Sequence, residues 1–313
     1  MTAAKPLFYL HTPNNGERWQ ALFAAELPDF EVVAVPAEVD PARVQYLATW
    51  RPPEGLFGRF ANLRAVFALG AGIDRFLQRS DLAPGVALVR LTDAGMAQQM
   101  CEYVLAGVLR YQRDLDRYAR QQAVAQWLPL PGRAAAELRV TVLGLGEIGG
   151  AVATTLALLG YAVAGWSRSP RELAGVRCLH GWDSLPTLLA ATDVLVNLLP
   201  NTPETHGLLN HERLAGLPKG AAVINAGRGE QLEESALLAL LDAGHLRGAQ
   251  LDVLGQEPPE QDHPFWRHPA IVLTPHIAAA TLPGPSARQV AGKLRGLLRG
   301  ETVPGLVDRE RAY

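Results

Sequence analysis

The stretch LRVTVLGLGEIGGAVATTLALLG, residues 138–160, contains the most specific local motif of this 313-residue chain. An apolar run leads into Gly144, Gly146 and Gly149, spaced as G-x-G-x-x-G, and a helix-like segment follows. Strand before and helix after is the context that a phosphate-binding turn requires, since the glycines permit a tight turn and close backbone approach. An ordinary glycine-rich turn is the alternative. The motif predicts that a dinucleotide contacts Gly144, Leu145, Gly146, Glu147, Ile148 and Gly149.

The stretch GWSRSP, residues 165–170, lies where a dinucleotide-binding fold usually ends its second strand on an acidic residue. Arg168 follows Gly144 by 24 residues (168 − 144), close to the spacing of about 20 at which that acid holds the adenosine ribose. A 2′-phosphate at this point would repel a carboxylate and bind a guanidinium. Arg168, with hydroxyl donors from Ser167 and Ser169, therefore favours NADP; a solvated surface arginine is the alternative.

Short strand-like apolar runs alternate with helix-like segments along the chain, which predicts parallel sheets covered by helices on both faces. From residue 96 to 127 the apolar residues recur at three- and four-residue steps, which predicts a long helical segment. A chain of 313 residues is long for a single core and suits two domains. The strand-like runs of the first part are PLFYLHT (6–12), FEVVAV (30–35), VQYLATW (44–50), AVFALG (65–70) and ALVRL (87–91).

Composition excludes several classes of function. Hydrophobic residues make up 48% and charged residues 19%, with a formal net charge of −2, so neither disorder nor a nucleic-acid surface is predicted. The two cysteines, Cys101 and Cys178, lie far apart, which predicts no disulfide framework and no metal site. No apolar run approaches the roughly 20 residues of a membrane span, and the N-terminal run is too short for a signal sequence. A cytoplasmic protein is expected.

Three short stretches each end an apparent strand on a residue that carries chemistry. They are INAGRGE (224–230) with Arg228, LDVLGQEPP (251–259) with Glu257, and LTPHIAA (273–279) with His276. Because the carboxyl ends of parallel strands line one crevice, we expect these side chains to be neighbours. Hydride delivery to a 2-oxo acid needs a cation for the substrate carboxylate, a proton donor and a group that holds the donor. Each residue alone has an ordinary structural interpretation.

The motifs GLGEIGG, NLLPNTPETHGLLN, VINAGRGE, GAQLDVLGQEPP and VLTPHIAA occur in the order and spacing of one family. The chain resembles the D-isomer-specific 2-hydroxyacid dehydrogenases along nearly its whole length, and most closely their glyoxylate- and hydroxypyruvate-reducing members. The resemblance implies Arg228 as substrate clamp, His276 as acid/base and Glu257 as its partner. It also implies that amides near Ala71 and Gly72 bind the substrate carboxylate. Implied cofactor contacts are Asp252, at the nicotinamide carboxamide, Leu199 and Pro200.

The same resemblance implies the architecture. Residues 1–95 with 285–313 would form a flavodoxin-like substrate domain, residues 96–284 a Rossmann-like nucleotide domain, and the active site would lie in the cleft between them. Trp50 follows a strand end and would wall the pocket, unless it is only a packing residue. Family members generally form dimers through the nucleotide domain, so a homodimer is expected. Trp127 would then lie on the arm that reaches the partner.

The expected function is NADPH-dependent reduction of small 2-oxo acids, glyoxylate to glycolate and hydroxypyruvate to D-glycerate. One alternative is an NAD-linked dehydrogenase of the phosphoglycerate or D-lactate type. Another is a non-catalytic, nucleotide-sensing protein like the corepressors that share this fold. Loss of NADPH absorbance on addition of glyoxylate distinguishes the reductase from both.

Overall fold

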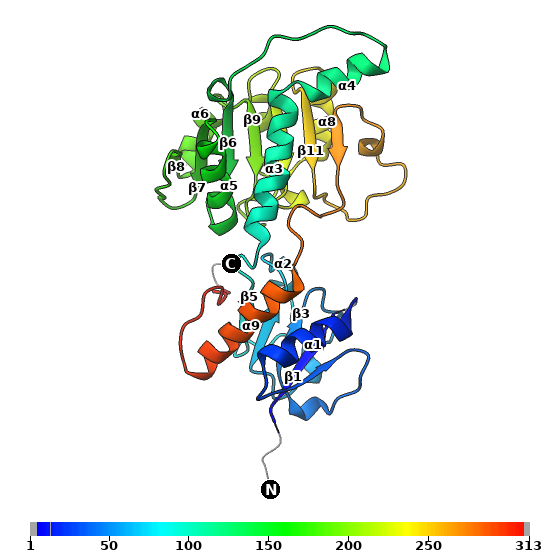
Figure 1. Cartoon of the computed structure of the whole chain (residues 1–313), viewed down its shortest axis with the longest axis vertical. Coiled ribbons are helices and arrows are strands. Elements are labelled where there is room, and N and C mark those ends of the chain that lie inside the picture. Colours follow the sequence, from blue (N-terminus) through cyan, green and yellow to red (C-terminus); the bar gives the residue numbers. More distant parts are fainter. Residues whose placement is uncertain (1–4, 13, 310–313) are drawn as a thin grey trace. The chain divides into compact units, whose positions relative to one another are not determined.

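The structure, a computed structural model, describes residues 5–12 and 14–309, which fall into two compact units (Figure 1). One unit runs to Gly95 and resumes at Thr281, and the other is Met96–Ala280. Thr281 is the residue at which the chain returns to the first unit, and its hydroxyl donates to the carbonyl of Leu69 at 2.7 Å. The predicted fold class, two parallel-sheet α/β domains, is confirmed.

The first unit is a parallel sheet whose strands pair in the order β2-β1-β3-β4-β5. Apolar residues of the strands, such as Leu7, Leu47 and Val66, are buried in one core cluster. The chain order reverses between β1 and β3, which is where open parallel sheets form their ligand crevice. The strands are β1 (Leu7–His11), β2 (Glu31–Ala34), β3 (Val44–Thr49), β4 (Ala65–Ala68) and β5 (Ala87–Arg90), and the helices are α1 (Gly16–Glu26), α2 (Asp74–Leu77) and α9 (Pro283–Leu298).

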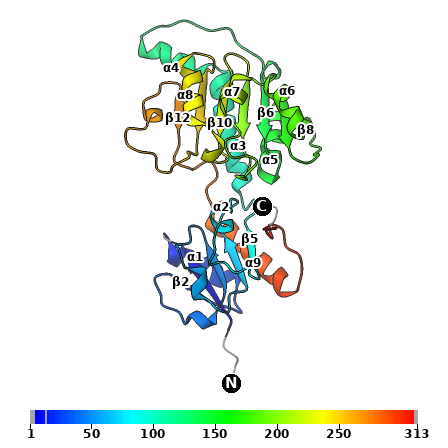
Figure 2. The same cartoon turned by 180° about the vertical axis from the view of Figure 1, so that it is seen from behind.

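The second unit is a parallel sheet in the order β12-β11-β10-β9-β6-β7-β8, with helices on both faces (Figure 2). Its strands are β6 (Arg139–Leu143), β7 (Ala162–Ser167), β8 (Arg177–His180), β9 (Val194–Asn197), β10 (Ala222–Asn225), β11 (Gly248–Leu251) and β12 (Ile271–Leu273). Its helices are α3 (Met96–Gln112), α4 (Leu115–Ala123), α5 (Glu147–Leu158), α6 (Leu185–Leu189), α7 (His211–Ala215) and α8 (Glu234–Asp242). Short 3₁₀ helices in the two units occupy Pro41–Arg43, Phe57–Arg59, Ala135–Glu137, Trp182–Ser184, Gly229–Gln231 and Pro264–Trp266.

Two hydrophobic clusters hold this second sheet between its helices. Helices α3 and α5 contribute residues such as Val104 and Val152 to the cluster on one face. Helices α6, α7 and α8 contribute residues such as Leu188, Leu214 and Leu237 to the cluster on the other face. The central strands are buried on both faces, which is why they read as continuous apolar runs such as VLVN and AVIN.

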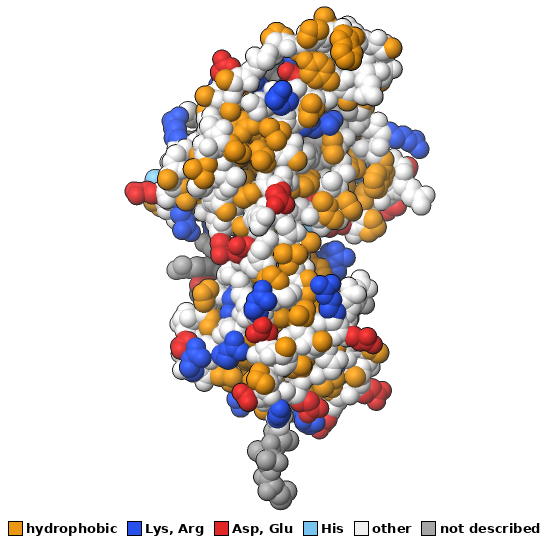
Figure 3. Space-filling model, viewed as in Figure 1, with side chains coloured by type: hydrophobic (Ala, Val, Ile, Leu, Met, Phe, Trp, Pro, Cys, Tyr) orange, Lys and Arg blue, Asp and Glu red, His pale blue; other side chains and the backbone are white. Residues whose placement is uncertain are grey.

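The single long helix expected from residue 96 to 127 is wrong in detail. The chain forms α3 and α4, separated at Asp114, whose φ of 54° lies in the left-handed region. The buried apolar spacing stops at Tyr111, so no continuous stripe holds the helix straight beyond it. After α4 the chain runs as an extended arm along one end of the second unit. Exposed apolar side chains gather there, around α4 and the arm (Figure 3).

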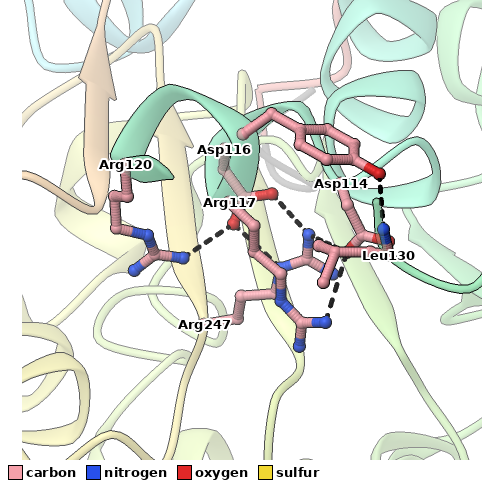
Figure 4. A network of polar contacts seen from close by, with 7 residues as sticks. Asp114, Asp116, Arg117, Arg120, Leu130 and Arg247 are labelled. Carbon is pink, nitrogen blue, oxygen red and sulfur yellow. Dashed lines mark hydrogen bonds and ion pairs between the residues drawn. The ribbon is translucent and has the colours of Figure 1, made fainter. Parts of the chain in front are cut away.

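A network of ion pairs fixes the break between α3 and α4 (Figure 4). Arg247, immediately before β11, donates to Asp114 at 2.6 Å and through Nε to Asp116 at 2.8 Å. Arg120 donates to Asp116 at 3.1 Å, and Arg117 pairs with Asp114. Burial tends to raise the pKa of Asp116, but the hydrogen bond and charge of Arg247 outweigh it and lower the pKa below its ordinary value. The helix therefore bends where an acidic pair meets a buried arginine.

Candidate active site

The three chemistry-bearing side chains of the second unit lie at the carboxyl edge of its sheet. Arg228 follows β10, Glu257 follows β11 and His276 follows β12, and these three strands are adjacent in the sheet. Parallel strands place their carboxyl ends at a common edge, so residues separated by up to 48 positions (276 − 228) converge. The expectation that they are neighbours therefore rests on strand order, which the structure supplies.

His276 and Glu257 form a hydrogen-bonded pair. Nδ1 of His276 lies 2.8 Å from Oε2 of Glu257, and the other carboxylate oxygen, Oε1, accepts from the backbone N–H of Leu254 at 3.3 Å. Burial tends to raise the pKa of Glu257, but the hydrogen bond and charge of His276, the Leu254 amide and the charge of Arg228 outweigh it, so the pKa is lowered. The pair fixes one ring nitrogen and leaves Nε2 for chemistry.

Arg228 approaches this pair because the β10 and β11 loops pack backbone to backbone. A Cβ at Gly229 would lie 1.8 Å from the carbonyl carbon of Leu254, so only glycine permits the contact. Since Leu254 also bonds Glu257, this contact brings the Arg228 loop beside the Glu257 loop. Nη1 of Arg228 donates to the Gly227 carbonyl at 2.7 Å. A guanidinium is planar and presents paired N–H donors, which suits a carboxylate.

The turn that carries His276 is held by Asp252. Its Oδ1 accepts from Thr274 Oγ1 at 2.6 Å and from Ile277 N at 2.8 Å, and its Oδ2 accepts from Ala278 N at 2.8 Å. These bonds hold His276 at a φ of 57°, a left-handed conformation that is uncommon for residues other than glycine. Asp252 is buried at 3% exposure. Its contacts assign it to positioning the histidine turn, and its expected contact with nicotinamide stays a prediction.

Tyr103 of α3 contacts Thr274 and so adds a further hydrogen bond to the His276 turn. It was not identified from the sequence. Its hydroxyl lies 2.8 Å from Thr274 Oγ1, and because that hydroxyl donates to Asp252, Tyr103 is the donor. Burial raises the pKa of Tyr103 to about 12, so the phenol keeps its proton across the working pH range. The sequence shows Tyr103 only as one more residue of a helix, since nothing local relates it to a loop 171 positions away.

The buried side-chain amides of Asn197, Asn225 and Gln231 hold the ends of β9 and β10 together. They were not identified from the sequence. Nδ2 of Asn197 donates to Asn225 Oδ1 at 2.9 Å and to Gln231 Oε1 at 2.6 Å. Gln231 Oε1 also accepts from the backbone of Arg228 at 3.1 Å, while its Nε2 donates to the Pro200 carbonyl at 2.8 Å. The network ties the Arg228 loop to the strand end at Leu199 and Pro200, two predicted cofactor contacts. Asparagine at the end of two strands, VLVN and AVIN, was the available signal.

The glycine turn has the geometry that a dinucleotide phosphate requires. A Cβ at Gly149 would lie 1.8 Å from the Gly144 carbonyl oxygen, so α5 packs directly on the turn, and Gly144 has a φ of 96°. A Cβ at Gly146 would meet nothing within 4 Å, which leaves open space at the N-terminus of α5 for a phosphate. The side chain of Leu145 is buried against Gly165, so Leu145 can contribute only backbone. Ile148 is half-buried and Glu147 exposed.

Arg168 directly follows β7, as the spacing predicts, and its Nη1 lies 3.1 Å from Oε2 of Glu204. The Ser167 hydroxyl donates to the Ser169 carbonyl at 2.8 Å and closes the turn, and the expected contact of Ser167 with the coenzyme stays a prediction. Ser169 itself is exposed. A pocket beside the glycine turn is lined by Gly146, Arg171 and Glu172, among others. Arg171 thus lies beside the glycine turn together with Glu147 and Glu172, and Arg168 lies at the end of the neighbouring strand β7.

The predicted substrate-binding residues of the first unit cluster at the ends of β3 and β4. The ring of Trp50 lies so close to Gly70 that a Cβ there would fall 1.7 Å from the ring. Ala71 and Gly72 follow immediately and are half-buried. Trp50 is therefore fixed beside the turn whose amides are expected to bind a carboxylate. Its role in substrate binding, and those of Ala71 and Gly72, stay predictions.

Among residues 5–12 and 14–309, no group of three or more His, Cys, Asp or Glu residues could hold a metal ion. No helix within these ranges is long and apolar enough to cross a membrane.

A phosphate-binding turn on a parallel sheet, with an arginine and a histidine–glutamate pair at the same edge, defines a dinucleotide-dependent dehydrogenase. Residues 105–278 match the NAD-binding domain of the D-isomer specific 2-hydroxyacid dehydrogenases. The chain belongs to this family, which confirms the resemblance seen in its motifs.

Relatives of the chain span nearly its whole length. The glyoxylate/hydroxypyruvate reductase A of Serratia proteamaculans is 42% identical over 96% of this chain and 98% of its own. A D-isomer specific 2-hydroxyacid dehydrogenase from Xanthobacter autotrophicus, solved with NADPH and MES, is 42% identical with a TM-score of 0.95, covering 99% of this chain and 100% of that one. The NADPH-dependent glyoxylate/hydroxypyruvate reductase of Sinorhizobium meliloti, solved with NADP and sulfate, is 32% identical with a TM-score of 0.93 and the same coverage.

Proposed function

We propose that this chain reduces small 2-oxo acids with NADPH, converting glyoxylate to glycolate and hydroxypyruvate to D-glycerate. The observation that carries the proposal is the His276–Glu257 pair beside Arg228, on the same sheet edge as Arg168. The names of the Serratia and Sinorhizobium relatives, and the coenzymes in the two solved structures, support the substrate class and the coenzyme.

The coenzyme would be held by the chain's own groups at three points. The open N-terminus of α5 at Gly146 would bind the pyrophosphate, Arg168 the 2′-phosphate, and the strand end at Leu199 and Pro200 would line the site. NADPH supplies the hydride when bound. The residues that follow fix the substrate and move the proton.

Arg228 orients the substrate. Its planar guanidinium can hold the carboxylate and the neighbouring carbonyl oxygen of a 2-oxo acid together, which fixes the carbonyl carbon for attack and stabilises the charge that develops on oxygen. The Gly229–Leu254 packing and the Gln231 network hold the Arg228 loop in place. In Arg228→Lys the charge remains but the fork is lost, so turnover as well as substrate affinity should fall.

His276 supplies the proton. Its imidazolium donates from Nε2 to the alkoxide oxygen as hydride reaches the carbonyl carbon, while Glu257 holds Nδ1–H and balances the positive charge. Glu257 is suited to this role because its lowered pKa keeps it ionised. In the oxidative direction the neutral ring accepts the proton, so the reverse reaction should be favoured by higher pH.

The experiment is a substrate panel run with both coenzymes on the purified full-length protein. NADPH oxidation with glyoxylate and hydroxypyruvate, and a much weaker rate with NADH, is the expected result. Faster turnover with NAD and phosphoglycerate or D-lactate would replace the proposal with an NAD-linked dehydrogenase. Tight coenzyme binding without turnover of any 2-oxo acid would replace it with a nucleotide-sensing protein.

We also propose a homodimer formed through the second unit. Exposed apolar side chains on α4 and the arm support it: Leu115 is 51%, Val124 73%, Trp127 98% and Leu128 51% exposed. An exposed apolar group of this kind is typical of a protein interface. Light scattering should give twice the chain mass, and Trp127→Glu with Val124→Glu should shift the protein toward monomer. A wild-type monomer at micromolar concentration would contradict the dimer.

A further inference from the structure

We propose that Glu204 is a built-in competitor for the 2′-phosphate: its carboxylate pairs with Arg168 in the free protein and must yield that guanidinium when NADPH binds. Nη1 of Arg168 lies 3.1 Å from Oε2 of Glu204, an ion pair 36 positions apart in the sequence. The inference rests on the proposed NADPH-dependent function. It makes Glu204 a residue that sets coenzyme affinity and release.

The topology of the second unit places this pair at the coenzyme site. Arg168 follows β7 and Glu204 lies in the loop after β9, and these two strands pair with β6 on its two sides. Strand β6 carries the glycine turn at its carboxyl end. The Arg168–Glu204 ion pair therefore joins the loop after β7 to the loop after β9. The glycine turn follows β6, the strand between them.

The loop that carries Glu204 is preformed. Thr205 Oγ1 accepts from the backbone N–H of Thr202 at 2.9 Å and donates to the Pro200 carbonyl at 2.7 Å. The N–H groups of Thr205 and His206 both donate to the Thr202 carbonyl at 3.0 Å. Both threonines are buried, whereas the Glu204 side chain is 54% exposed. The turn thus fixes the backbone of Glu204 and leaves its carboxylate free to separate from Arg168.

Charge decides which anion keeps the guanidinium. A 2′-phosphate carries up to two negative charges and three acceptor oxygens, whereas Glu204 offers one charge. Because the Arg168 side chain is 35% exposed and Glu204 more so, their ion pair is weak and exchangeable. The 2′-phosphate can displace the Glu204 carboxylate from Arg168. The displaced carboxylate remains nearby and repels the phosphate. NADH lacks the phosphate, so Glu204 should affect NADPH and NADP⁺ alone.

The test is coenzyme binding by the full-length chain, measured as dissociation constants and dissociation rates for NADPH, NADP⁺ and NADH at low and high salt. In Glu204→Gln, NADPH and NADP⁺ should bind about three- to tenfold more tightly and leave more slowly, which corresponds to removing one charge near the phosphate. The NADH constant should not move. The gain should shrink as added salt screens the repulsion.

Three further proteins complete the design. Glu212→Gln, which neutralises an exposed glutamate on α7, is the matched control and should leave all constants unchanged. In the Arg168→Ala background, Glu204→Gln should give a smaller gain than in the wild type, because the competition for the guanidinium no longer exists. NADPH affinity that is unchanged or weaker in Glu204→Gln, or NADH affinity that rises equally, would overturn the inference.

The same measurements distinguish an error in the proposed coenzyme site from an error in the Glu204 inference. If Arg168→Ala leaves NADPH affinity unchanged, or the wild type binds NADH as tightly as NADPH, the assignment of Arg168 to the 2′-phosphate is wrong and the Glu204 inference falls with it. If Arg168→Ala weakens NADPH alone while Glu204→Gln has no effect, only the competitor role of Glu204 is wrong.

Discussion

Two charged clusters of the second unit, Asp116 with Arg247 and Glu257 with His276, differ in how completely they are enclosed. Arg247 and Asp116 have side chains 10% and 9% exposed, and each has further charged partners in Asp114 and Arg120. His276 and Glu257 are 33% and 24% exposed, and the histidine contributes one ring nitrogen to the pair. The enclosed cluster of several ion pairs stabilises the fold, whereas the His276–Glu257 pair engages one ring nitrogen and leaves Nε2 for proton transfer.

The largest expected effect is the loss of activity in His276→Ala, which should leave stability close to that of the wild type. His276→Ala removes the proton donor, so the reductive rate should fall by about a thousandfold, within the usual range for losing a general acid. NADPH affinity and thermal stability should stay close to wild type, because the ring makes one hydrogen bond at a partly exposed position. Steady-state kinetics with glyoxylate and a coenzyme titration measure both. A variant that keeps a tenth of the activity would remove His276 from the mechanism.

Asp116→Asn breaks the enclosed cluster instead. It leaves Arg247 buried with Asp114 alone, and the free energy of unfolding should fall by about 3 kcal/mol, typical of breaking a buried pair. The kinetic constants of the folded protein should not change. Because the pKa of Asp116 is lowered in the folded state, its contribution is present above the ordinary value of 3.8 and is lost as pH falls through the lowered one.

Urea unfolding at several pH values checks the Asp116 prediction. The stability difference between wild type and Asp116→Asn should be full at neutral pH and should narrow in acid. A difference that is constant with pH would mean that Asp116 does not act as a carboxylate in the folded protein. Asp242→Asn, at a carboxylate 73% exposed, is the control and should have little effect.

Glu257→Gln tests whether the negative charge of Glu257 supports proton transfer by His276. The amide keeps the shape but removes the negative charge that balances the imidazolium, so the reductive rate at neutral pH should fall by roughly ten- to a hundredfold. The alkaline limb of the reductive pH profile should move to lower pH. The lowered pKa of Glu257 means that the wild-type pair stays intact from neutral pH down through the ordinary value of 4.5. An unmoved alkaline limb would show that Glu257 does not balance His276.

The smallest effect concerns Tyr103, which acts on His276 only through Thr274 and Asp252. Tyr103→Phe removes one hydrogen bond from the chain that holds the histidine turn, so kcat should fall by about three- to tenfold, the equivalent of one net hydrogen bond. NADPH affinity and the pH profile should be unchanged. Tyr161→Phe is the control, since its hydroxyl bonds Gln112 at 2.6 Å, away from the turn. Equal effects of the two substitutions would assign Tyr103 to general stability.

The sequence predicted correctly what depends on neighbouring residues. The glycine turn follows a strand and opens α5, because only glycine accepts the φ of 96° at Gly144 and the close contact at Gly149. Apolar runs of four to six residues gave the buried parallel strands. The same local signals failed at Asp114, where Arg247, far along the chain, holds the backbone in a conformation that helix propensity disfavours.

The sequence alone also supplied the residue types Arg228, Glu257 and His276, each at the end of an apolar run. Only the tertiary structure decided that they converge, since the order β10-β11-β12 and the Gly229–Leu254 contact set their spacing. It also decided that Ser167 closes its own turn, and that Asp252 and Tyr103 hold the His276 turn. Turn geometry and strand propensity depend on a few adjacent residues, so the sequence shows them directly. Pairing between loops depends on which strands lie side by side, and that follows from burying the whole sheet at once.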